Sequence, residues 1–535
     1  MGGTGISGRR YRRAVALAAV AVLSVTGVSG CGGGAEGKEG AAKPSATAEP
    51  SARGVPGADG APGSAAPPLP ARFTGQRLEW GECEAPEPGQ DAPGEAWRCA
   101  TLTAPLDYHA PGGETIELAL IRREASEPEG RVGSLLFNFG GPGGSGVASL
   151  PGHGDSFATL GRAYDLVGFD PRGVGASSQI RCLDDAGIED MLALDATPDT
   201  AAEEKTYLDQ SSALGAACGR EAGGLLPHVG TADAARDMDL MRHVLGDNQL
   251  HYLGFSYGTT LGGTYAHLFP RRVGRMVLDA AVDPTANTVA HLRHQTTGFQ
   301  RALENYLAST GADPAEGSAR LAALLEELDA KPLPASGGRE LTESLARTGI
   351  VAALYREENW PLLTRALSRA DDGDGSTLLA LADFYNGRDQ KGRYDASAHA
   401  QRAISCADDS ARPTPEDARG IVPEFEAISP VFGAFLAWDA AGWCAGWPVA
   451  GARETPDVSA AGAAPIVVVG TTGDPATPVE GAERMAEELG GDVGVLLTYD
   501  GEGHGAYLGD SACVRGAVDA YLLDGDVPED GTRCA

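Results

Sequence analysis

The chain lacks several patterns that mark other classes of protein. None of its nine cysteines forms a CxxC pair, which disfavours a zinc cluster or a thioredoxin-like redox site. Its glycine-rich segment at 140–146 is interrupted by Pro142 and is not followed by Gly-Lys-Ser/Thr, so neither a dinucleotide site nor a P-loop is expected. His291 and His294 have helical spacing but no evident third ligand, and we expect no metal and no cofactor.

Positive charge is scarce in this sequence. Lysine and arginine number 42 against 74 aspartates and glutamates, a formal net charge of −32. Such a charge repels nucleic acid and anionic lipid headgroups, so nucleic acid is not an expected partner. It would mildly attract cations such as free peptide N-termini, although a solvated acidic surface also accounts for the total.

The first thirty residues have the features of an export signal. Four arginines between positions 9 and 13 precede an apolar run, Ala14 to Val25, that is too short for a permanent membrane helix. Val28-Ser29-Gly30-Cys31 then resembles a bacterial lipobox, in which the cysteine becomes the acylated N-terminus. We predict a signal peptide at 1–30, lipidation of Cys31 and anchoring to the outer face of the cytoplasmic membrane. Ordinary cleavage at a small-residue site is the alternative, and the arginines leave Sec and twin-arginine export both open.

Without Cys31 the chain has eight cysteines, an even number that suits the disulfides of an exported protein. Eight cysteines allow about 105 connectivities, of which pairing neighbours along the chain is the simplest. That choice predicts the disulfides Cys83–Cys99, Cys182–Cys218, Cys406–Cys444 and Cys513–Cys534.

Residues 31–71 consist mostly of small and polar residue types with almost no large apolar side chain. Such a segment cannot bury enough surface to offset the entropy of ordering it. We therefore predict a disordered tether at 31–71 and a folded part that begins near Phe73.

Short apolar runs alternate with helical patterns over much of the remaining chain, as in α/β proteins. Most of these runs are nearly continuous in hydrophobicity, which indicates strands buried on both faces of a mostly parallel sheet, whereas 115–120 alternates with period two, as expected of a half-buried strand. The expected strands cover 115–120, 134–139, 164–169, 250–253, 275–278, 465–469 and 495–499. Helical periodicity replaces strands at 286–455, for instance at 318–328 and 360–370. We expect a core at 72–285, a helical cap insertion at 286–455 and a C-terminal part of the core at 456–535.

Gly254-Phe255-Ser256-Tyr257-Gly258 matches G-x-S-x-G, the nucleophile elbow of the α/β-hydrolase fold. A predicted strand precedes it and a predicted helix, 259–268, follows, which is the context this motif requires. Flanking glycines relieve the strained turn that lifts the serine oxygen above the sheet. Ser256 is therefore the expected nucleophile, with a turn of no catalytic role as the alternative.

A catalytic serine needs a base, and His504 is the best candidate. It lies in a glycine-framed loop after the last predicted strand, where the order Ser…Asp…His of this fold places the base. His251 and His267 lie within the strand and the helix around the elbow, which favours structural roles.

The orienting acid should follow the penultimate strand, and Asp474 lies there. Its role would be to fix the His504 tautomer and stabilise the imidazolium. Asp279, at the end of an earlier strand, is the rival, and Asp283 is a weaker one. The oxyanion hole requires two backbone donors. We assign these to the N–H of Tyr257 and, within the segment 140–146, to that of Gly141.

Three sequence motifs occur in an order typical of one family. They are the glycine-rich segment Phe139 to Gly146, the segment Asp170 to Ser177 and the elbow Gly254 to Thr259. Together with Pro105 to Tyr108 and the segment from Gly470 through Gly505 to Cys534, the chain resembles the secreted tripeptidyl aminopeptidases, relatives of the prolyl aminopeptidases. The resemblance spans roughly Trp80 to Ala535. It implies release of short peptides from free N-termini through an acyl-enzyme, with Ser256, Asp474 and His504 as nucleophile, acid and base.

The resemblance also implies a cap that blocks the groove and binds the substrate ammonium with carboxylates. No cap carboxylate can be aligned securely, and each could instead be a solvated charge. The candidates are Glu357, Glu358, Asp408 and Glu424, with Asp409, Glu426 and Asp439 as further acids of the cap. Four tryptophans of the cap could line an apolar pocket, although core packing is the simpler use: Trp360, Trp438, Trp443 and Trp447.

The sequence thus predicts an extracytoplasmic serine exopeptidase that releases tripeptides or dipeptides from peptides with free N-termini. A carboxylesterase of the same fold is the first alternative, because ester cleavage uses the same residues. A non-catalytic surface lipoprotein that binds peptides is the second.

Overall fold

The computed structural model describes residues 67–86, 91–453 and 456–535. The predicted signal peptide, Cys31 and residues 31–66 of the predicted tether lie outside these residues. Helix α1 (Ala71–Thr74) begins at the last residue of the predicted tether, and its Phe73 is fully buried. Within the described ranges, no helix combines the length and apolar character needed to cross a membrane.

The centre of the described chain is a nine-stranded sheet with the order β1-β2-β4-β3-β5-β6-β9-β10-β11. The pairs β1–β2 and β2–β4 are antiparallel and all other neighbours in it are parallel. This mostly parallel sheet with crossover helices is the predicted α/β-hydrolase fold. The strands are β1 (Arg98–Pro105), β2 (Thr115–Arg123), β3 (Gly133–Asn138), β4 (Tyr164–Phe169), β5 (Leu250–Phe255), β6 (Val273–Asp279), β9 (Ile466–Gly473), β10 (Gly494–Glu502) and β11 (Thr532–Cys534).

Each of the seven predicted strands is present, and β1 and β11 are additional. The central strands β3 and β4 are buried at every residue, which explains their continuous apolar runs. By contrast, β1 mixes buried and more exposed residues and contains two threonines, and β11 has only three residues. Neither gives the apolar run, or the regular alternation of β2, by which the other strands are recognised.

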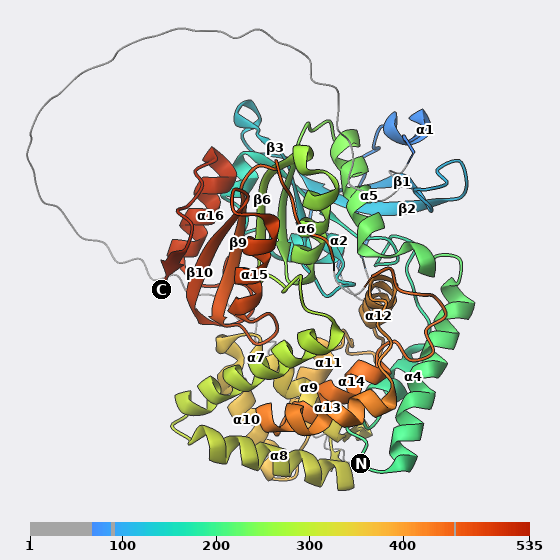
Figure 1. Ribbon diagram of the computed structural model, residues 1–535, viewed down its shortest axis with the longest axis vertical. Helices are drawn as coiled ribbons and strands as arrows, with labels where there is room; N and C mark the ends of the chain where they lie inside the picture. The colour runs from blue at the N-terminus through green and yellow to red at the C-terminus, as the bar shows by residue number, and fades with distance from the viewer. Residues whose placement is uncertain (1–66, 87–90, 454–455) are drawn as a thin grey trace, which may run out of the picture. The chain divides into compact units, whose positions relative to one another are not determined.

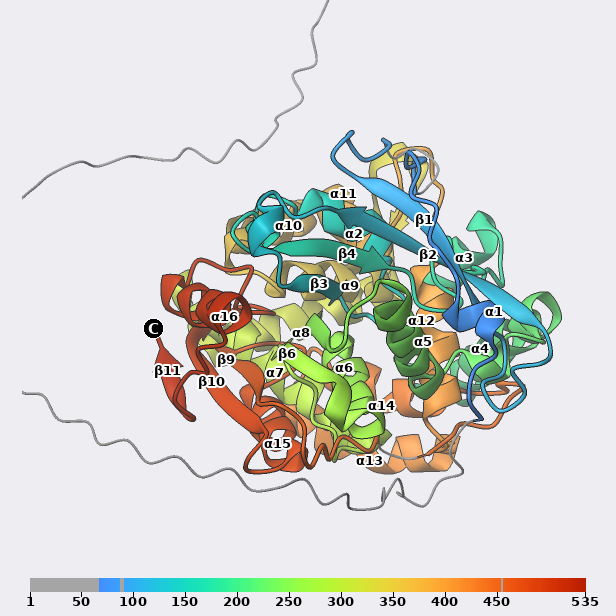
Figure 2. The ribbon, with the colours of Figure 1, turned by 90° about the horizontal axis from the view of Figure 1, so that it is seen from above.

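Helices cover both faces of the sheet (Figure 2). Leu136 and Leu278 point to one face and their neighbours Phe137 and Val277 to the other, because side chains alternate along a strand. The first face packs against α5 (Thr231–Val244), α6 (Tyr257–Leu268) and α15 (Val479–Leu489). The second packs against α2 (Gly146–Gly152) and α16 (Ala512–Asp524).

A helical insertion connects β6 to β9 (Figure 1). Its helices are α7 (Thr288–Ser309), α8 (Pro314–Ala330), α9 (Glu343–Leu354), α10 (Trp360–Asp371), α11 (Ser376–Tyr385), α12 (Ser397–Asp408), α13 (Pro415–Ile428) and α14 (Gly433–Gly442). The periodic stretches at 318–328 and 360–370 fall in α8 and α10. The short strands β7 (Leu333–Pro334) and β8 (Glu340–Leu341) pair with each other. Most of these helices share an apolar cluster of their own, separate from those of the sheet.

Two helices depart from this division. The buried side chains of α12, such as Ala403 and Ile404, belong to the apolar cluster of the sheet and not to that of the insertion. Conversely α4 (Ala201–Ala222), which lies between β4 and β5 in the sequence, packs on α14: the Tyr207 ring meets Trp438 edge-on at 6.5 Å. The helix α3 (Asp185–Leu192) precedes α4. The insertion and the core therefore exchange helices: α12 of the insertion packs on the sheet, and α4 of the core packs on the insertion.

The described residues contain four disulfides, and these join the same pairs that the sequence predicts: Cys83–Cys99, Cys182–Cys218, Cys406–Cys444 and Cys513–Cys534. Disulfides persist in oxidising compartments, so these bonds are consistent with an extracytoplasmic location.

Candidate active site

Ser256 lies at the junction of β5 and α6 in a strained conformation. Its φ and ψ are 55° and −124°, a region that costs a non-glycine residue about 1–3 kcal/mol. The turn is fixed by a hydrogen bond from Ser256 N to Asp279 O, at 3.0 Å. A Cβ atom at Gly254 would lie 2.5 Å from Gly258 O, and one at Gly258 would lie 2.8 Å from Asn138 O. Both glycines of the motif are thus required by close backbone packing.

His504 and Asp474 are brought together by the loops that follow β10 and β9. His504 Nδ1 lies 2.9 Å and 3.0 Å from the two carboxylate oxygens of Asp474, which is fully buried. An ionised carboxylate can only accept, so Nδ1 carries the proton and Nε2 is left free to act as a base. Asp474 also accepts hydrogen bonds from the N–H groups of Ala476 and Thr477, at 2.9 Å and 2.8 Å. The Thr477 hydroxyl lies 3.3 Å from His504 Nδ1.

The environment of His504 raises the pKa of its imidazole. Burial acts to lower this pKa, but the charge of Asp474 and the hydrogen bond to it act in the opposite direction and prevail, with a further contribution from Asp279. The imidazolium that forms when a base takes up a proton is therefore stabilised.

Asp279, the rival acid, has another role in the geometry. Its buried carboxylate accepts hydrogen bonds from the N–H groups of Ala506 and Tyr507, at 3.0 Å and 2.8 Å. It thereby fixes the chain just after His504, while the imidazole pairs with Asp474. A Cβ atom at Gly505 would lie 3.8 Å from the ring of Phe255, so the histidine loop lies against the residue that precedes Ser256. The weaker rival, Asp283, lies 3.7 Å from His294 Nδ1.

The two predicted oxyanion donors belong to the elbow and to the glycine loop that packs against it. Tyr257 is the first residue of α6, where N–H groups have no partner within the helix and the helix dipole is positive. The glycine loop packs against this turn: a Cβ atom at Gly140 would lie 2.6 Å from Phe255 O, 2.8 Å from the Ser256 Cβ and 3.2 Å from Tyr257 N. Gly140 and the next residue, Gly141, have φ values of 87° and 111°. The loop therefore approaches the elbow so closely that only glycine fits.

Asp170 fixes this glycine loop from the sheet side. Its carboxylate accepts from the Ser145 hydroxyl at 2.6 Å and from the N–H groups of Val147 and Ala176 at 3.0 Å and 2.9 Å. Burial raises the pKa of Asp170, while these hydrogen bonds oppose the shift. The motif Asp170 to Ser177 thus holds the glycine loop in place.

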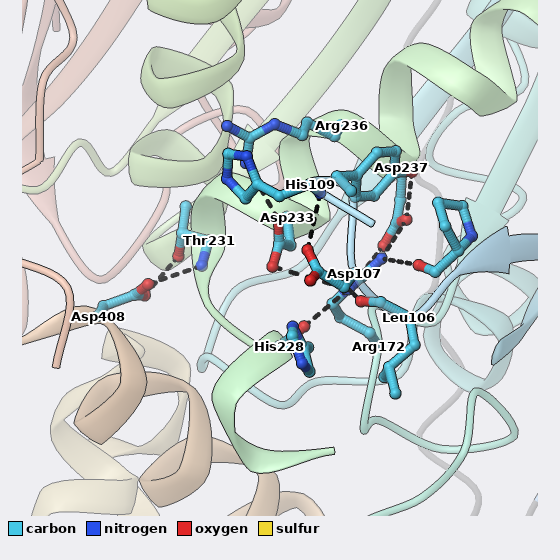
Figure 3. A network of polar contacts seen from close by, with 12 residues as sticks. Leu106, Asp107, His109, Arg172, His228, Thr231, Asp233, Arg236, Asp237 and Asp408 are labelled. Carbon is cyan, nitrogen blue, oxygen red and sulfur yellow. Dashed lines mark hydrogen bonds and ion pairs between the residues drawn. The ribbon is translucent and has the colours of Figure 1, made fainter. Parts of the chain in front are cut away.

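Arg172 of the same motif is the centre of a buried network (Figure 3). Its Nε and Nη2 donate to both carboxylate oxygens of Asp237 at 2.7 Å and 2.6 Å. Its Nη1 donates to the carbonyl groups of Leu106 and His228 at 3.0 Å and 2.8 Å. The Tyr108 hydroxyl donates to Asp237 at 2.7 Å. The network joins the segment after β1 to α5, and so explains why Pro105 to Tyr108 accompanies the catalytic motifs.

The histidine loop is contacted by the insertion through Tyr355, which sequence reasoning did not single out. Tyr355 O accepts a hydrogen bond from His504 N at 2.9 Å. Its ring meets the imidazole edge-on, at 5.1 Å and 84°. The exposed candidates Glu357 and Glu358 lie in a 3-10 turn (Glu357–Asn359) that begins two residues after Tyr355.

Glu502 is a second residue that sequence reasoning missed. Asn305 donates to its Oε1 at 2.8 Å, whereas its buried Oε2 has no hydrogen-bond partner among the described residues. Burial raises the pKa of Glu502 to about 7, and the nearby charge of Glu357 adds to the effect. The signal that could have identified it is its place two residues before the predicted base.

The other predicted ammonium ligands have partners elsewhere. Asp408 accepts hydrogen bonds from Thr231, and Glu424 pairs with Arg293 at 2.6 Å. Asp409 accepts from the Thr288 hydroxyl. Three of the four tryptophans are buried: Trp360, Trp438 and Trp447. The fourth, Trp443, packs under the Arg402 guanidinium at 4.5 Å. Their surroundings favour packing roles.

The arrangement of a serine on a strained elbow, a carboxylate-paired histidine and two backbone N–H groups suits acyl transfer. A family described as TAP-like protein matches residues 429–534, which include Asp474 and His504. Serine protease Hip1 from Mycobacterium tuberculosis is 39% identical over 487 residues, covering 86% of this chain and 91% of that protein.

Two further relatives carry different names. Carboxylesterase B from Mycobacterium tuberculosis is 38% identical over 507 residues, covering 88% of this chain and 95% of that protein. Tripeptidyl aminopeptidase from Streptomyces coelicolor is 29% identical over 492 residues, covering 87% of each chain. The protein is therefore a serine hydrolase that belongs to the TAP-like family of the α/β-hydrolase fold.

Proposed function

We propose that this hydrolase is an extracytoplasmic aminopeptidase that releases tripeptides or dipeptides from free N-termini. The hydrolytic part of the proposal rests on the contact of His504 Nδ1 with both oxygens of Asp474, at 2.9 Å and 3.0 Å, in a loop that lies against the Ser256 elbow. This contact orients Nε2 for proton transfer.

In the proposed reaction Ser256 Oγ attacks the scissile carbonyl while His504 Nε2 takes the hydroxyl proton. The N–H groups of Tyr257 and Gly141 stabilise the oxyanion, and Asp474 stays ionised beside the imidazolium. His504 then gives its proton to the leaving amine, so the peptide bond breaks and an ester to Ser256 remains. Water attacks this ester with His504 again as the base, which releases the short peptide and restores the serine.

Recognition of a free N-terminus needs carboxylates near the elbow. Glu357 and Glu502 suit this role because they flank the contact between Tyr355 and His504, and because their mutual repulsion would be relieved by a cation. Glu358 remains a candidate beside them. We propose Glu357 and Glu502 as the principal ligands of the substrate ammonium.

Comparison of a tripeptide amide substrate with its N-acetylated form tests the exopeptidase specificity. We expect the free amine to be strongly preferred, and we expect Glu502→Gln to raise KM for that substrate with a smaller change for the acetylated one. Glu416→Gln, an exposed acid-to-amide change on α13, is the matched control. Equal cleavage of both substrates would show that the specificity is wrong.

A carboxylesterase is the second candidate, because a relative that covers 88% of this chain carries that name. The two functions differ in the leaving group. Turnover of short acyl esters without cleavage of any free tripeptide amide would favour the esterase.

We further propose that a lipid on Cys31 anchors the enzyme outside the cytoplasmic membrane. The four disulfides of the described chain support an oxidising location. Mass spectrometry of the mature N-terminus should find a diacylglyceryl group on Cys31, and an unmodified cysteine there would refute the anchor.

A further inference from the structure

Helix α12 contacts the glycine loop of the oxyanion hole with its first turn. A Cβ atom at Gly143 would lie 2.6 Å from Ser397 O and 2.9 Å from Gln401 N, so loop and helix touch backbone to backbone. The Gln401 side chain also donates to Gly141 O at 3.3 Å. Although α12 lies within the insertion in the sequence, its apolar face packs in the cluster of the sheet.

The last residue of the same helix, Asp408, is linked to the other side of the oxyanion hole. Its carboxylate accepts from Thr231 N at 2.7 Å and from Thr231 Oγ1 at 2.5 Å (Figure 3). Thr231 Oγ1 in turn lies 2.6 Å from the hydroxyl of Tyr257. One helix therefore reaches both proposed oxyanion donors, one from each of its ends.

Burial raises the pKa of Asp408 to about 6, so above that pH its carboxylate is ionised and can only accept. The single proton of the Thr231 hydroxyl is then donated to Asp408. The hydroxyl of Tyr257 must then donate to the lone pair of Thr231 Oγ1. The chain Tyr257–Thr231–Asp408 is thus fully satisfied in one orientation only, and it fixes the ring that leads to the Tyr257 backbone.

Both ends of this hydrogen-bond chain are held by further contacts. Thr231 is the first residue of α5, whose Asp237 is bound by the buried Arg172. Asp408 ends a helix that is tied through Cys406 to Cys444. Asp408 has no ion pair in the described part of the chain, so its carboxylate is committed to Thr231.

We propose that α12 is a positioning element for the oxyanion hole, with Asp408 and Thr231 as positioning residues for Tyr257. The inference rests on the proposed function, because it takes the Tyr257 N–H as an oxyanion donor. A donor must lie within about 0.5 Å of its productive position, and loss of one donor typically lowers kcat by about 10²–10³-fold. Release of the Tyr257 ring should displace the donor only in part and lower kcat by about tenfold.

The test compares Thr231→Val with Thr231→Ser in the whole chain. Valine preserves the shape of threonine and removes the hydroxyl, whereas serine keeps the hydroxyl and removes a methyl group; the backbone N–H remains in both. With an activated acyl ester as substrate, we expect Thr231→Val to lose kcat by about tenfold at unchanged KM, and Thr231→Ser to retain wild-type kcat. A peptide-like trifluoromethyl ketone reports on the hole directly. Its carbonyl carbon bonds to Ser256 Oγ, the serine proton passes to His504, and the resulting oxyanion occupies the hole. Its affinity should fall by the same factor as kcat.

Asp408→Ala should reproduce the loss seen with Thr231→Val, because alanine removes the acceptor and supplies no new donor to Thr231. The double variant should be no worse than either single one, because both act through one hydrogen-bond chain. Glu416→Ala, a change of an exposed acid on α13, is its control. If Thr231→Val does not fold, Tyr257→Phe removes the same link and should show the same loss.

A loss of melting temperature without a loss of kcat in Thr231→Val, or a change confined to KM, would overturn the proposal while leaving the proposed function intact. Failure of the wild-type chain to react with a fluorophosphonate at Ser256 would overturn both.

Discussion

The sheet core and the helical insertion contact the site in different ways. In the core, buried carboxylates bind several partners at once: Asp170, Asp279 and Asp474 each accept two or more hydrogen bonds from groups of the site. The insertion reaches the site through few side chains, among them the Tyr355 ring and Gln401. This difference indicates that the core carries the chemistry and that the insertion adjusts it. Changes in the core should therefore have much larger effects.

Ser256→Ala should have the largest effect of all. Removal of a catalytic serine lowers kcat on the order of 10⁶-fold, and labelling by a fluorophosphonate should disappear with it. Retention of the wild-type melting temperature would show that the loss is chemical. Turnover at the wild-type rate would sink the proposed function.

Asp474→Asn should lower kcat by about 10⁴-fold, because asparagine can donate to Nδ1 and so favours the wrong tautomer of His504. The comparison is Asp279→Asn, which leaves the imidazole paired but replaces one acceptor oxygen by an NH2 group that cannot accept from the N–H of Ala506 or Tyr507. That change should cost about 1–3 kcal/mol of stability and largely preserve kcat. The reverse pattern, with Asp279→Asn the more damaging to kcat, would make Asp279 the acid.

The sequence allowed prediction of the parts of this site that depend on local backbone. The elbow could be predicted because Gly254 and Gly258 are demanded by a turn within one motif, and the acid and base because each follows a buried apolar strand. Tyr355, Glu502 and Thr231 were missed because their contacts arise only when segments far apart in the chain meet. Asp408 is an example of the same limit, since its position in the insertion made it resemble a solvated charge or a substrate ligand.

The pH dependence of kcat/KM should follow His504. Catalysis needs its neutral form, and the pairing with Asp474 raises the pKa of His504 above its usual value near 6.5. Activity should therefore fall as the pH drops through that raised pKa, by about tenfold per pH unit below it. In Asp474→Asn the residual activity should have its acidic limb at lower pH, because the charge that raises the pKa is gone.

A substitution of Glu502 separates its own titration from that of His504. Its pKa is raised to about 7, so loss of its charge at lower pH should weaken binding of a free amine and appear in KM. Glu502→Gln should remove that component and leave the limb in kcat, which belongs to His504. A limb in kcat that disappears in Glu502→Gln would contradict the assignment of the base.

The smallest effect is expected where the insertion contacts the base. Tyr355→Ala removes the ring that lies edge-on to the imidazole, whereas Tyr355→Phe retains the ring and loses only the hydroxyl that lies 3.4 Å from that of Tyr385. An aromatic pair contributes about 0.5–1.5 kcal/mol, so Tyr355→Ala should lower kcat by about two- to tenfold, and Tyr355→Phe should leave it close to wild type. The carbonyl of residue 355 still accepts from His504 N in both variants, so the histidine loop stays in place and the ring alone is tested. A loss in Tyr355→Ala as large as that in Asp474→Asn would mean that the insertion supplies part of the catalytic machinery, and the division between core and insertion would have to be abandoned.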